Sequence, residues 1–331
     1  MTGPSSRRHF LPSPTSGSRN EKRFKIRERL KGSNFILRIE KLNEVTLQAA
    51  AKINLYLDIL ARRSDGYHEI ESIIQSVRLY DKLILRPRRS GIKILCKSKR
   101  VPLDQGNICY RAAESLLATV GIKQGLEIEI QKNIPVGSGL GGGSADAAAT
   151  LIGMRKIFDI DISFLDLSKL ALGLGSDVPF CLAGGTALVR GRGEKIVPLP
   201  PLKDGWFLLV NPGIPIFTSW VYSRLKGKLT KKRLDIKLVK ELLKEEGIRG
   251  VNKLPLYNKL EEVVVEEFPA LGEIKAKLIE AGATGALVTG SGSTVFAVVE
   301  DQEKVTSILA KLGRKLRVNA VRATDKGVKE A

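Results

Sequence analysis

A glycine-rich loop between two regular elements constrains the fold and function of this chain more than any other feature. Residues 135–148 read PVGSGLGGGSADAA, with five glycines among the seven residues from Gly137 to Gly143. Glycine adopts backbone angles closed to other residues and lets the backbone approach a ligand closely. A helix beginning near Ser144 would add free N–H groups and the positive end of its dipole. Together they predict an anion-binding site, and the expected anion is a phosphate.

Three other interpretations of the loop were weighed. The string contains a formal G-x-G-x-x-G with Asp159 or Asp161 downstream, which is the pattern of dinucleotide-binding folds. The segment before it, 126–131 (LEIEIQ), alternates apolar and polar residues, whereas a Rossmann strand is buried on both faces and continuously apolar. No Lys-Ser or Lys-Thr pair follows the glycines, which argues against a P-loop. A flexible linker is a weaker alternative, because ordered patterns flank the loop on both sides.

Length and composition indicate an ordinary globular protein of about two domains. Of the 331 residues, 43% are hydrophobic, and no apolar run approaches the roughly 18 residues that span a bilayer. Export and membrane insertion are therefore not expected. Cys96, Cys109 and Cys181 are widely spaced and odd in number, which predicts reduced, mostly buried thiols in an intracellular protein.

The net charge of +20 raises the question of nucleic-acid binding. The first 41 residues hold 11 Lys and Arg against 3 Glu, so +8 of the charge lies there and +12 on the remainder. No aromatic-rich strand of RNA-recognition type accompanies the charge, so attraction of polyanionic small molecules is favoured. We interpret residues 1–41 as a basic, poorly ordered extension. The expected location is the cytoplasm, or the plastid stroma if this extension is a transit peptide.

The order of the expected elements indicates an α+β fold rather than a doubly wound sheet. Strands are expected at 45–61, 79–87 and 126–131, with helices at 107–120, from about 144 to 158, and at 165–174. A second half begins at Trp206, after a proline-rich break. It contains helices at 235–246, 258–268, 269–281 and 302–312, and strands at 206–213 (WFLLVNPG), at 317–323 and on both sides of a second glycine loop, 290–293.

Five strings, in order, resemble the GHMP small-molecule kinases. They are AAAKINLYLDIL from Ala49, SDGYHEIESIIQSV from Ser64, PVGSGLGGGSADAA from Pro135, LGSDVPFCL from Leu174 and TGSGSTVFAV from Thr289. The resemblance implies a two-domain GHMP kinase fold, with an N-terminal domain like domain 2 of ribosomal protein S5 and a ferredoxin-like C-terminal domain. The expected boundaries are 42–203 for the ATP-binding domain and 204–328 for the substrate domain.

The resemblance also implies ATP and Mg²⁺ as cofactors. Such kinases wrap the ATP phosphates with the glycine loop, and phosphoryl transfer requires mainly positioning and charge neutralisation. Ser144-Ala145-Asp146 departs from the Ser-Ser or Ser-Asn of many members, which leaves the metal ligands open, with Ser144 and Asp146 as candidates. The ATP-binding residues implied are Asn107 and Lys132 on the adenine side and Pro135, Val136, Gly137, Ser138, Gly139, Leu140, Gly141, Gly142, Gly143 and Ser144.

The catalytic residues implied are Asp177, which matches the family's catalytic carboxylate, and Lys52, which lies where it can pair with that carboxylate. The first two strings resemble the branch that acts on 4-diphosphocytidyl-2-C-methyl-D-erythritol, in the methylerythritol phosphate route to isoprenoids. A cytosine ring can stack between aromatic faces while a histidine and the backbone read its edge. The substrate-binding residues implied are Asn54, Tyr67, His68, Thr218 and Tyr222.

The expected activity is therefore ATP-dependent phosphorylation of the 2-hydroxyl of that substrate by a monomer or weak homodimer, with no membrane partner and no nucleic acid as the main partner. A mevalonate- or homoserine-type kinase is the alternative within the superfamily. From another class, a non-catalytic nucleotide- or RNA-binding protein stays open. A Ser-His hydrolase is set aside, because His68 is the only histidine outside the extension and the chain lacks a G-x-S-x-G elbow.

Overall fold

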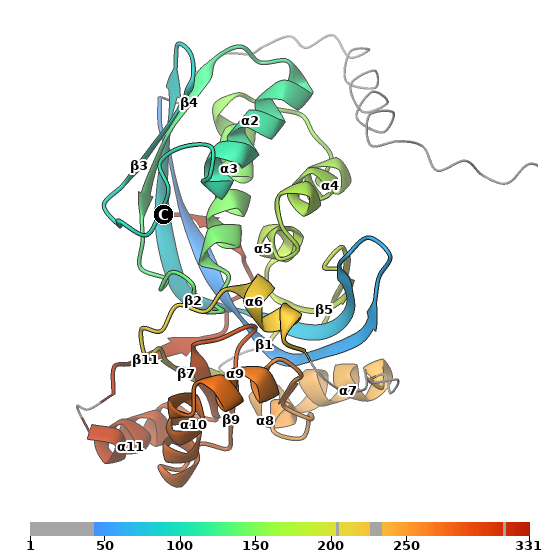
Figure 1. Cartoon of the computed structure of the whole chain (residues 1–331), viewed down its shortest axis with the longest axis vertical. Coiled ribbons are helices and arrows are strands. Elements are labelled where there is room, and N and C mark those ends of the chain that lie inside the picture. The colour runs from blue at the N-terminus through green and yellow to red at the C-terminus, as the bar shows by residue number, and fades with distance from the viewer. Residues whose placement is uncertain (1–42, 203–204, 226–233, 314–315) are drawn as a thin grey trace, which may run out of the picture.

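The computed structural model describes residues 43–202, 205–225, 234–313 and 316–331. The predicted extension at 1–41 and the predicted boundary between residues 203 and 204 lie outside the described residues. The described chain forms an eight-stranded and a four-stranded sheet, with helices packed on both (Figure 1). No helix in these four ranges has the length and apolar character needed to cross a bilayer.

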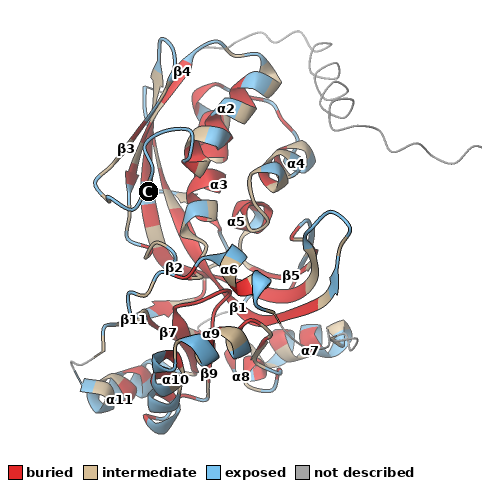
Figure 2. Ribbon diagram, in the orientation of Figure 1, coloured by how far each residue is buried: buried red, intermediate tan, exposed pale blue. Residues whose placement is uncertain are grey.

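The larger sheet is built on two long antiparallel strands, β1 (Val45–Arg62) and β2 (His68–Arg88). Both are buried over most of their length because helices cover one face and the smaller sheet packs against the middle of the two strands (Figure 2). The sheet order is β12-β1-β2-β4-β3, with β5 beside β2, β6 beside β5 and β8 beside β1. The other strands of this sheet are β3 (Ile92–Cys96), β4 (Gly125–Gln131), β5 (Thr186–Gly191), β6 (Lys195–Pro198), β8 (Tyr257–Asn258) and β12 (Val328–Glu330).

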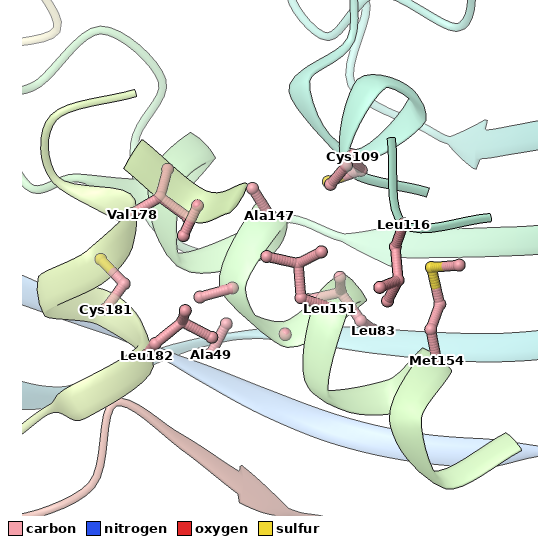
Figure 3. Close-up of a cluster of buried hydrophobic side chains, with 14 of the residues drawn as sticks. Ala49, Leu83, Cys109, Leu116, Ala147, Leu151, Met154, Val178, Cys181 and Leu182 are labelled. Atoms are coloured by element: carbon pink, nitrogen blue, oxygen red, sulfur yellow. The ribbon is translucent and has the colours of Figure 1, made fainter. Parts of the chain in front are cut away.

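Four helices cover one face of this sheet: α2 (Ile108–Val120), α3 (Gly142–Ile157), α4 (Phe164–Leu174) and α5 (Val178–Ala183). Helix α3 lies centrally and is rich in alanine, so that small side chains let it approach the strands (Figure 3). At Gly153, an added Cβ would lie 2.7 Å from Leu85 Cδ2 and 3.1 Å from Leu47 Cδ1. Close packing of this helix on β1 and β2 fixes where its N-terminus points.

The smaller sheet has the order β11-β7-β10-β9, and every neighbouring pair in it is antiparallel. Strand β7 is apolar throughout because both faces are buried: Phe207 and Leu209 join the core shared with the larger sheet, whereas Leu208 and Val210 face the helices. The strands are β7 (Trp206–Val210), β9 (Gly285–Val288), β10 (Val295–Val299) and β11 (Val318–Arg322). The helices of this half are α6 (Thr218–Ser223), α7 (Ile236–Glu246), α8 (Ile248–Val251), α9 (Glu261–Glu267), α10 (Ala270–Glu280) and α11 (Gln302–Leu312).

Two late segments of the chain return to the larger sheet. Strand β8 pairs in parallel with β1, and β12 pairs antiparallel with the start of β1. Gly327 lies so close to the backbone of Cys181 that an added Cβ would overlap its carbonyl oxygen. These contacts bind the two halves together, which keeps the space between them defined.

The α+β prediction is confirmed, and several element predictions need correction. The strand expected at 79–87 is the second part of β2, which begins at His68, because the preceding apolar segment pairs with β1 and β5. The helix expected near Ser144 begins two residues earlier, at Gly142. Asn258, expected to be helical, belongs to β8. Strand β4 is antiparallel to β2, as its alternation predicts, but parallel to β3.

The three cysteines are free thiols, as predicted. Cys109 on α2 and Cys181 on α5 are buried in the core, and Cys96 is partly buried. Burial raises the pKa of both buried thiols above the ordinary range. They act as small apolar side chains in the core.

Candidate functional site

A cavity of about 1210 Å³ lies between the two halves of the protein. It is lined by the glycine loop and the start of α3, by the turn between β1 and β2, and by α6. Leu140 is the one predicted site residue that does not line it, because its side chain is buried in the core. The predicted residues on the cavity wall are Lys52, Asn54, Tyr67, His68, Asn107, Lys132, Pro135, Val136, Gly137, Ser138, Gly139, Gly141, Gly142, Gly143, Ser144, Asp146, Asp177, Thr218 and Tyr222.

The glycine loop presents the N-terminus of α3 to the cavity. Gly141 is the N-cap of the helix, at φ 70°, and no side chain caps the first turn. Unpaired N–H groups at the start of a helix are donors for an anion, and the helix dipole places about half a positive charge there. The hydroxyl of Ser144 lies on the same wall of the cavity. The geometry therefore matches the predicted anion cradle.

A second glycine loop holds the first in place. The N–H of Thr294 donates to the carbonyl of Ser138 at 3.1 Å, and a Cβ added at Gly139 would overlap the carbonyl oxygen of Thr289. The hydroxyl of Ser138 donates to the carbonyl of Pro135 at 2.6 Å and closes the loop internally. The position of the glycine-loop backbone thus depends on contacts from the other half of the protein.

Lys52 and Asp177 come from distant parts of the sequence and form an ion pair on the wall of the cavity. Their Nζ and Oδ2 atoms are 3.3 Å apart, and Lys52 also donates to Asn54 Oδ1 at 2.8 Å. The Asn54 amide donates in turn to the hydroxyl of Ser72 at 3.0 Å. The Lys52 side chain is 6% exposed and that of Asp177 is 37% exposed. Asn54 thus holds the Lys52 ammonium group in place, and the Asp177 carboxylate faces the cavity.

Asp177 also sits at the N-cap position of α5, where an aspartate commonly serves only to cap a helix. Its side chain makes no capping hydrogen bond to that helix. The carboxylate is therefore available to a ligand on the side away from Lys52. This distinguishes Asp177 from Asp235, which caps α7 through bonds to two backbone N–H groups.

Lys132 lies in a buried cluster with two aspartates. Its ammonium group donates to Asp81 Oδ2 and, at 2.7 Å, to Asp146 Oδ2. Burial lowers the pKa of Lys132, but the charges of Asp146 and Asp81 outweigh this and leave the pKa above its usual value. Burial raises the pKa of Asp146 to about 8. Asp146 Oδ1 is buried with no hydrogen-bond partner among the described residues.

Asn107 caps helix α2. Its Oδ1 accepts from the N–H of Cys109 at 2.8 Å, and its Nδ2 donates to the carbonyl of Pro102 at 2.6 Å. Both Asn107 and Lys132 therefore have internal partners while lining the cavity. Their predicted contact with the adenine side of ATP stays a prediction.

The aromatic residues predicted for the acceptor line the part of the cavity formed by α6 and the turn between β1 and β2. The rings of His68 and Tyr222 are 4.9 Å apart at an interplanar angle of 38°, and Tyr67 is packed under Arg192. Burial, then the charge of Arg62, lowers the pKa of His68. Burial, then the charge of Asp177, raises the pKa of Tyr222. His68 is therefore a neutral imidazole near pH 7.

Thr218 begins α6 in the same part of the cavity, and its hydroxyl lies 3.0 Å from that of Ser291. Ser291 and Gly290 belong to the second glycine loop and line the cavity, yet sequence reasoning gave them no binding role. Their signal was available, since the loop was recognised as a motif. The cavity arginines were missed, because nothing in local spacing connects them to the site: Arg62, Arg100 and Arg192.

The sequence is similar to those of known proteins along most of its length. Residues 107–185 match the family model of the GHMP kinases N terminal domain, and residues 230–318 match that of the GHMP kinases C terminal domain. The 4-diphosphocytidyl-2-C-methyl-D-erythritol kinase of Pelotomaculum thermopropionicum is 44% identical over 82% of this chain and 94% of its own length. The protein of that name from Geobacter sulfurreducens is 41% identical over 79% and 92%.

Solved structures show the same architecture. A crystal structure of 4-(cytidine 5'-diphospho)-2C-methyl-D-erythritol kinase superimposes with a TM-score of 0.70 at 33% identity, covering 83% of this chain and 98% of its own. A homoserine kinase from Cytophaga hutchinsonii superimposes with a TM-score of 0.72 over 89% and 99%, at 22% identity. The second similarity shows the fold alone.

Proposed function

The chain belongs to the GHMP kinase family, and on that premise we propose that it transfers the γ-phosphoryl group of ATP to the 2-hydroxyl of 4-diphosphocytidyl-2-C-methyl-D-erythritol. The relatives at about 40% identity carry the name of this kinase, whereas the homoserine kinase is similar in fold only. The proposal requires one site for a nucleoside triphosphate and another for a nucleoside-diphosphate acceptor, with a base between them.

The observation that carries the proposal is the position of the Lys52–Asp177 pair. It lies in one cavity with the glycine loop and the α3 N-terminus on one side and the His68–Tyr222 ring pair on the other. Phosphoryl transfer needs the donor phosphate and the acceptor hydroxyl in line, with a group to accept the proton. A charged pair placed between an anion cradle and an aromatic pocket meets that requirement.

On the donor side, the backbone N–H groups at the start of α3 would bind the phosphates of ATP. Mg²⁺ is usually held through one or two carboxylates, substrate phosphates and water. Ser144 and Asp146 supply one hydroxyl and one carboxylate with an unpartnered oxygen, and they fit an ion that takes its remaining ligands from ATP and water. Such an ion would neutralise charge on the transferred group.

On the acceptor side, the cytosine ring would stack on the aromatic residues while the neutral imidazole of His68 contacts its hydrogen-bonding edge. Stacking of a base on an aromatic side chain is worth about 1–3 kcal/mol. Asp177 would accept the proton of the acceptor's 2-hydroxyl while the oxygen of that hydroxyl bonds to the γ-phosphorus. The bond from the γ-phosphorus to ADP would break, and ADP would leave. Lys52, held by Asn54, would neutralise Asp177 before the reaction and contact the transferred phosphoryl group.

The test is release of ADP, followed with a coupled assay, from purified protein given ATP, Mg²⁺ and each of three acceptors. We expect turnover with 4-diphosphocytidyl-2-C-methyl-D-erythritol and none above background with mevalonate or homoserine. Turnover only with mevalonate or homoserine would refute the acceptor assignment. Absence of turnover together with tight, salt-dependent RNA binding would favour the non-catalytic alternative. Cytoplasmic location and a monomeric or weakly dimeric state stay predictions from the sequence.

A further inference from the structure

Arg192 lies on the cavity wall at the acceptor end, in the turn that joins β5 to β6. The carbon at the centre of its guanidinium group is 4.6 Å from the centre of the Tyr67 ring. A planar guanidinium that lies over an aromatic ring keeps the N–H groups along its edge free to donate. Arg192 therefore faces the cavity as a cation with unused donors.

The acidic side chains near Arg192 are occupied by other groups. Glu194, in the same turn, accepts from the backbone N–H of Arg192 at 2.8 Å. Arg63 pairs with Asp65 at 3.1 Å and with Glu69 at 2.9 Å. Within the described residues, the guanidinium of Arg192 forms no ion pair with a carboxylate. Its charge is therefore available to a ligand.

The turn that carries Arg192 is fixed against the catalytic loop. Gly193 has φ 130°, and an added Cβ would overlap the carbonyl oxygen of Ser176, the residue before Asp177. Arg190, two residues before Arg192, pairs with the buried Glu71 at 2.6 Å. The side chain of Arg192 is thus held at a defined place between Tyr67 and the loop of Asp177.

The charges of the two lysines on the cavity wall are already neutralised, since Lys52 pairs with Asp177 and Lys132 pairs with two aspartates. Arg62 and Arg100 also line the cavity, and Arg192 is the cavity arginine whose guanidinium lies over the Tyr67 ring, 4.6 Å from its centre. We infer that Arg192 binds the diphosphate group of a nucleoside-diphosphate acceptor and so selects acceptors that carry one. The inference rests on the proposed function and adds to it a residue for the charged part of the acceptor.

This assignment separates the two parts of acceptor recognition. Tyr67, His68 and Tyr222 would contact the base, whereas Arg192 would contact the diphosphate through paired N–H···O bonds, the geometry in which arginine exceeds lysine. An acceptor without phosphate gains nothing from Arg192. Ligands that differ only in the diphosphate can therefore measure its contribution.

The experiment measures the affinity of the full-length protein for cytidine diphosphate and for cytidine by calorimetry. The variants are Arg192→Ala, Arg192→Lys and, as a matched control, Lys195→Ala, which removes an exposed cation from the same hairpin but outside the cavity. Affinity for cytidine diphosphate should fall roughly 10- to 100-fold in Arg192→Ala, the range expected for a charge-assisted bidentate contact. Affinity for cytidine should fall by at most about fivefold, the size of an exposed cation–π contact.

Arg192→Lys should bind cytidine diphosphate with intermediate affinity, and Lys195→Ala should bind it as the unchanged protein does. In turnover, Arg192→Ala should raise KM for the acceptor and leave KM for ATP within about twofold, since ATP binds at the other end of the cavity. Thermal melts of both Arg192 variants check that they are folded. If Arg192→Ala does not fold, the comparison is made with Arg192→Lys.

Equal losses for cytidine and cytidine diphosphate would overturn the inference, because Arg192 would then only support Tyr67. An Arg192→Ala variant that matches Lys195→Ala would overturn it as well. In both cases the proposed function survives if the unchanged protein turns over the acceptor. If the unchanged protein neither binds cytidine diphosphate nor releases ADP with the acceptor, the proposed function falls and this inference falls with it.

Discussion

Replacing Lys132 with methionine should destabilise the whole protein, because it leaves two buried carboxylates without their shared cation. The side chains of Asp81 and Asp146 are 0% and 5% exposed, and Lys132 at 9% donates to both. Removing one partner from a buried ion pair costs about 3–5 kcal/mol. For a chain of this length, each kcal/mol lowers the melting temperature by roughly 2 °C, so we expect a loss of about 6–10 °C.

The assay is thermal unfolding followed by circular dichroism, with Lys93→Met as the matched control. Lys93 pairs with Glu127 at 3.1 Å on the same sheet, but its side chain is 49% exposed. An exposed pair of this kind is worth about 0–1 kcal/mol, so its loss should shift the melting temperature by no more than about 2 °C. Methionine replaces lysine in both variants, so side-chain length is matched and burial differs.

A second substitution tests the electrostatic cause directly. Adding Asp146→Asn to Lys132→Met removes one of the two facing carboxylates, and the double variant should be more stable than Lys132→Met alone. Asp81 keeps its bonds from the N–H groups of Asn133 and Ile134, at 2.5 and 2.9 Å, which hold the start of the glycine loop. The reasoning is refuted if Lys132→Met has the same melting temperature as the Lys93→Met control. It is also refuted if the double variant is less stable than both single variants.

Three further outcomes follow from the site. Asp177→Asn should lower kcat roughly 100- to 10,000-fold while calorimetry shows unchanged affinity for cytidine diphosphate; a normal kcat would exclude it as the base. Gly139→Ala should raise KM for ATP and lower the melting temperature, whereas Gly121→Ala, at a similar φ of 76° in open space, should cost only about 1–2 kcal/mol and leave KM unchanged. Because the pKa of His68 is lowered, KM for the acceptor should stay constant above neutral pH and rise as pH falls through that pKa; His68→Gln should abolish this rise.

Local patterns predicted elements wherever burial follows one regular period. The bounds of α11 agree with the prediction, since this helix has a single apolar face. Strand β7 begins at Trp206 as predicted but ends at Val210, before the Asn-Pro-Gly of the predicted string. In α2, Ala112, Ala113, Leu116 and Leu117 form the buried face together with Cys109, whereas the apolar Ile108 lies on the cavity wall. Only the second part of β2 was expected as a strand, because the pairing of β2 with β1 shifts register between Val77 and Tyr80 and breaks the alternation there.

The donor half of the site was predictable from residues because a phosphate cradle is a local structure. Its glycine loop and helix are contiguous, and one string contains both. The acceptor half depends on segments far apart in sequence, such as β1, the β1–β2 turn and α6. Their residues were found through the family resemblance, which supplied Lys52, Asp177 and Tyr222 but gave no indication of Arg192. A binding role for Arg192 can be inferred only from the structure, which shows that the acidic side chains near it pair with other groups.

The structure gives further reasons why the loop at 137–143 is rich in glycine. A Cβ at Gly141 would lie 2.9 Å from Lys52 Cγ, and one at Gly139 would overlap the backbone of the second glycine loop. These two glycines therefore make room for Lys52 and for the opposite half of the protein, in addition to any phosphate. Gly143 faces open space, with its nearest side-chain neighbour at 3.8 Å, and is free to approach a ligand. Glycine density in the loop thus reflects two close approaches within the protein as well as open space for a ligand, and the loop is positioned by contacts from the second half of the chain.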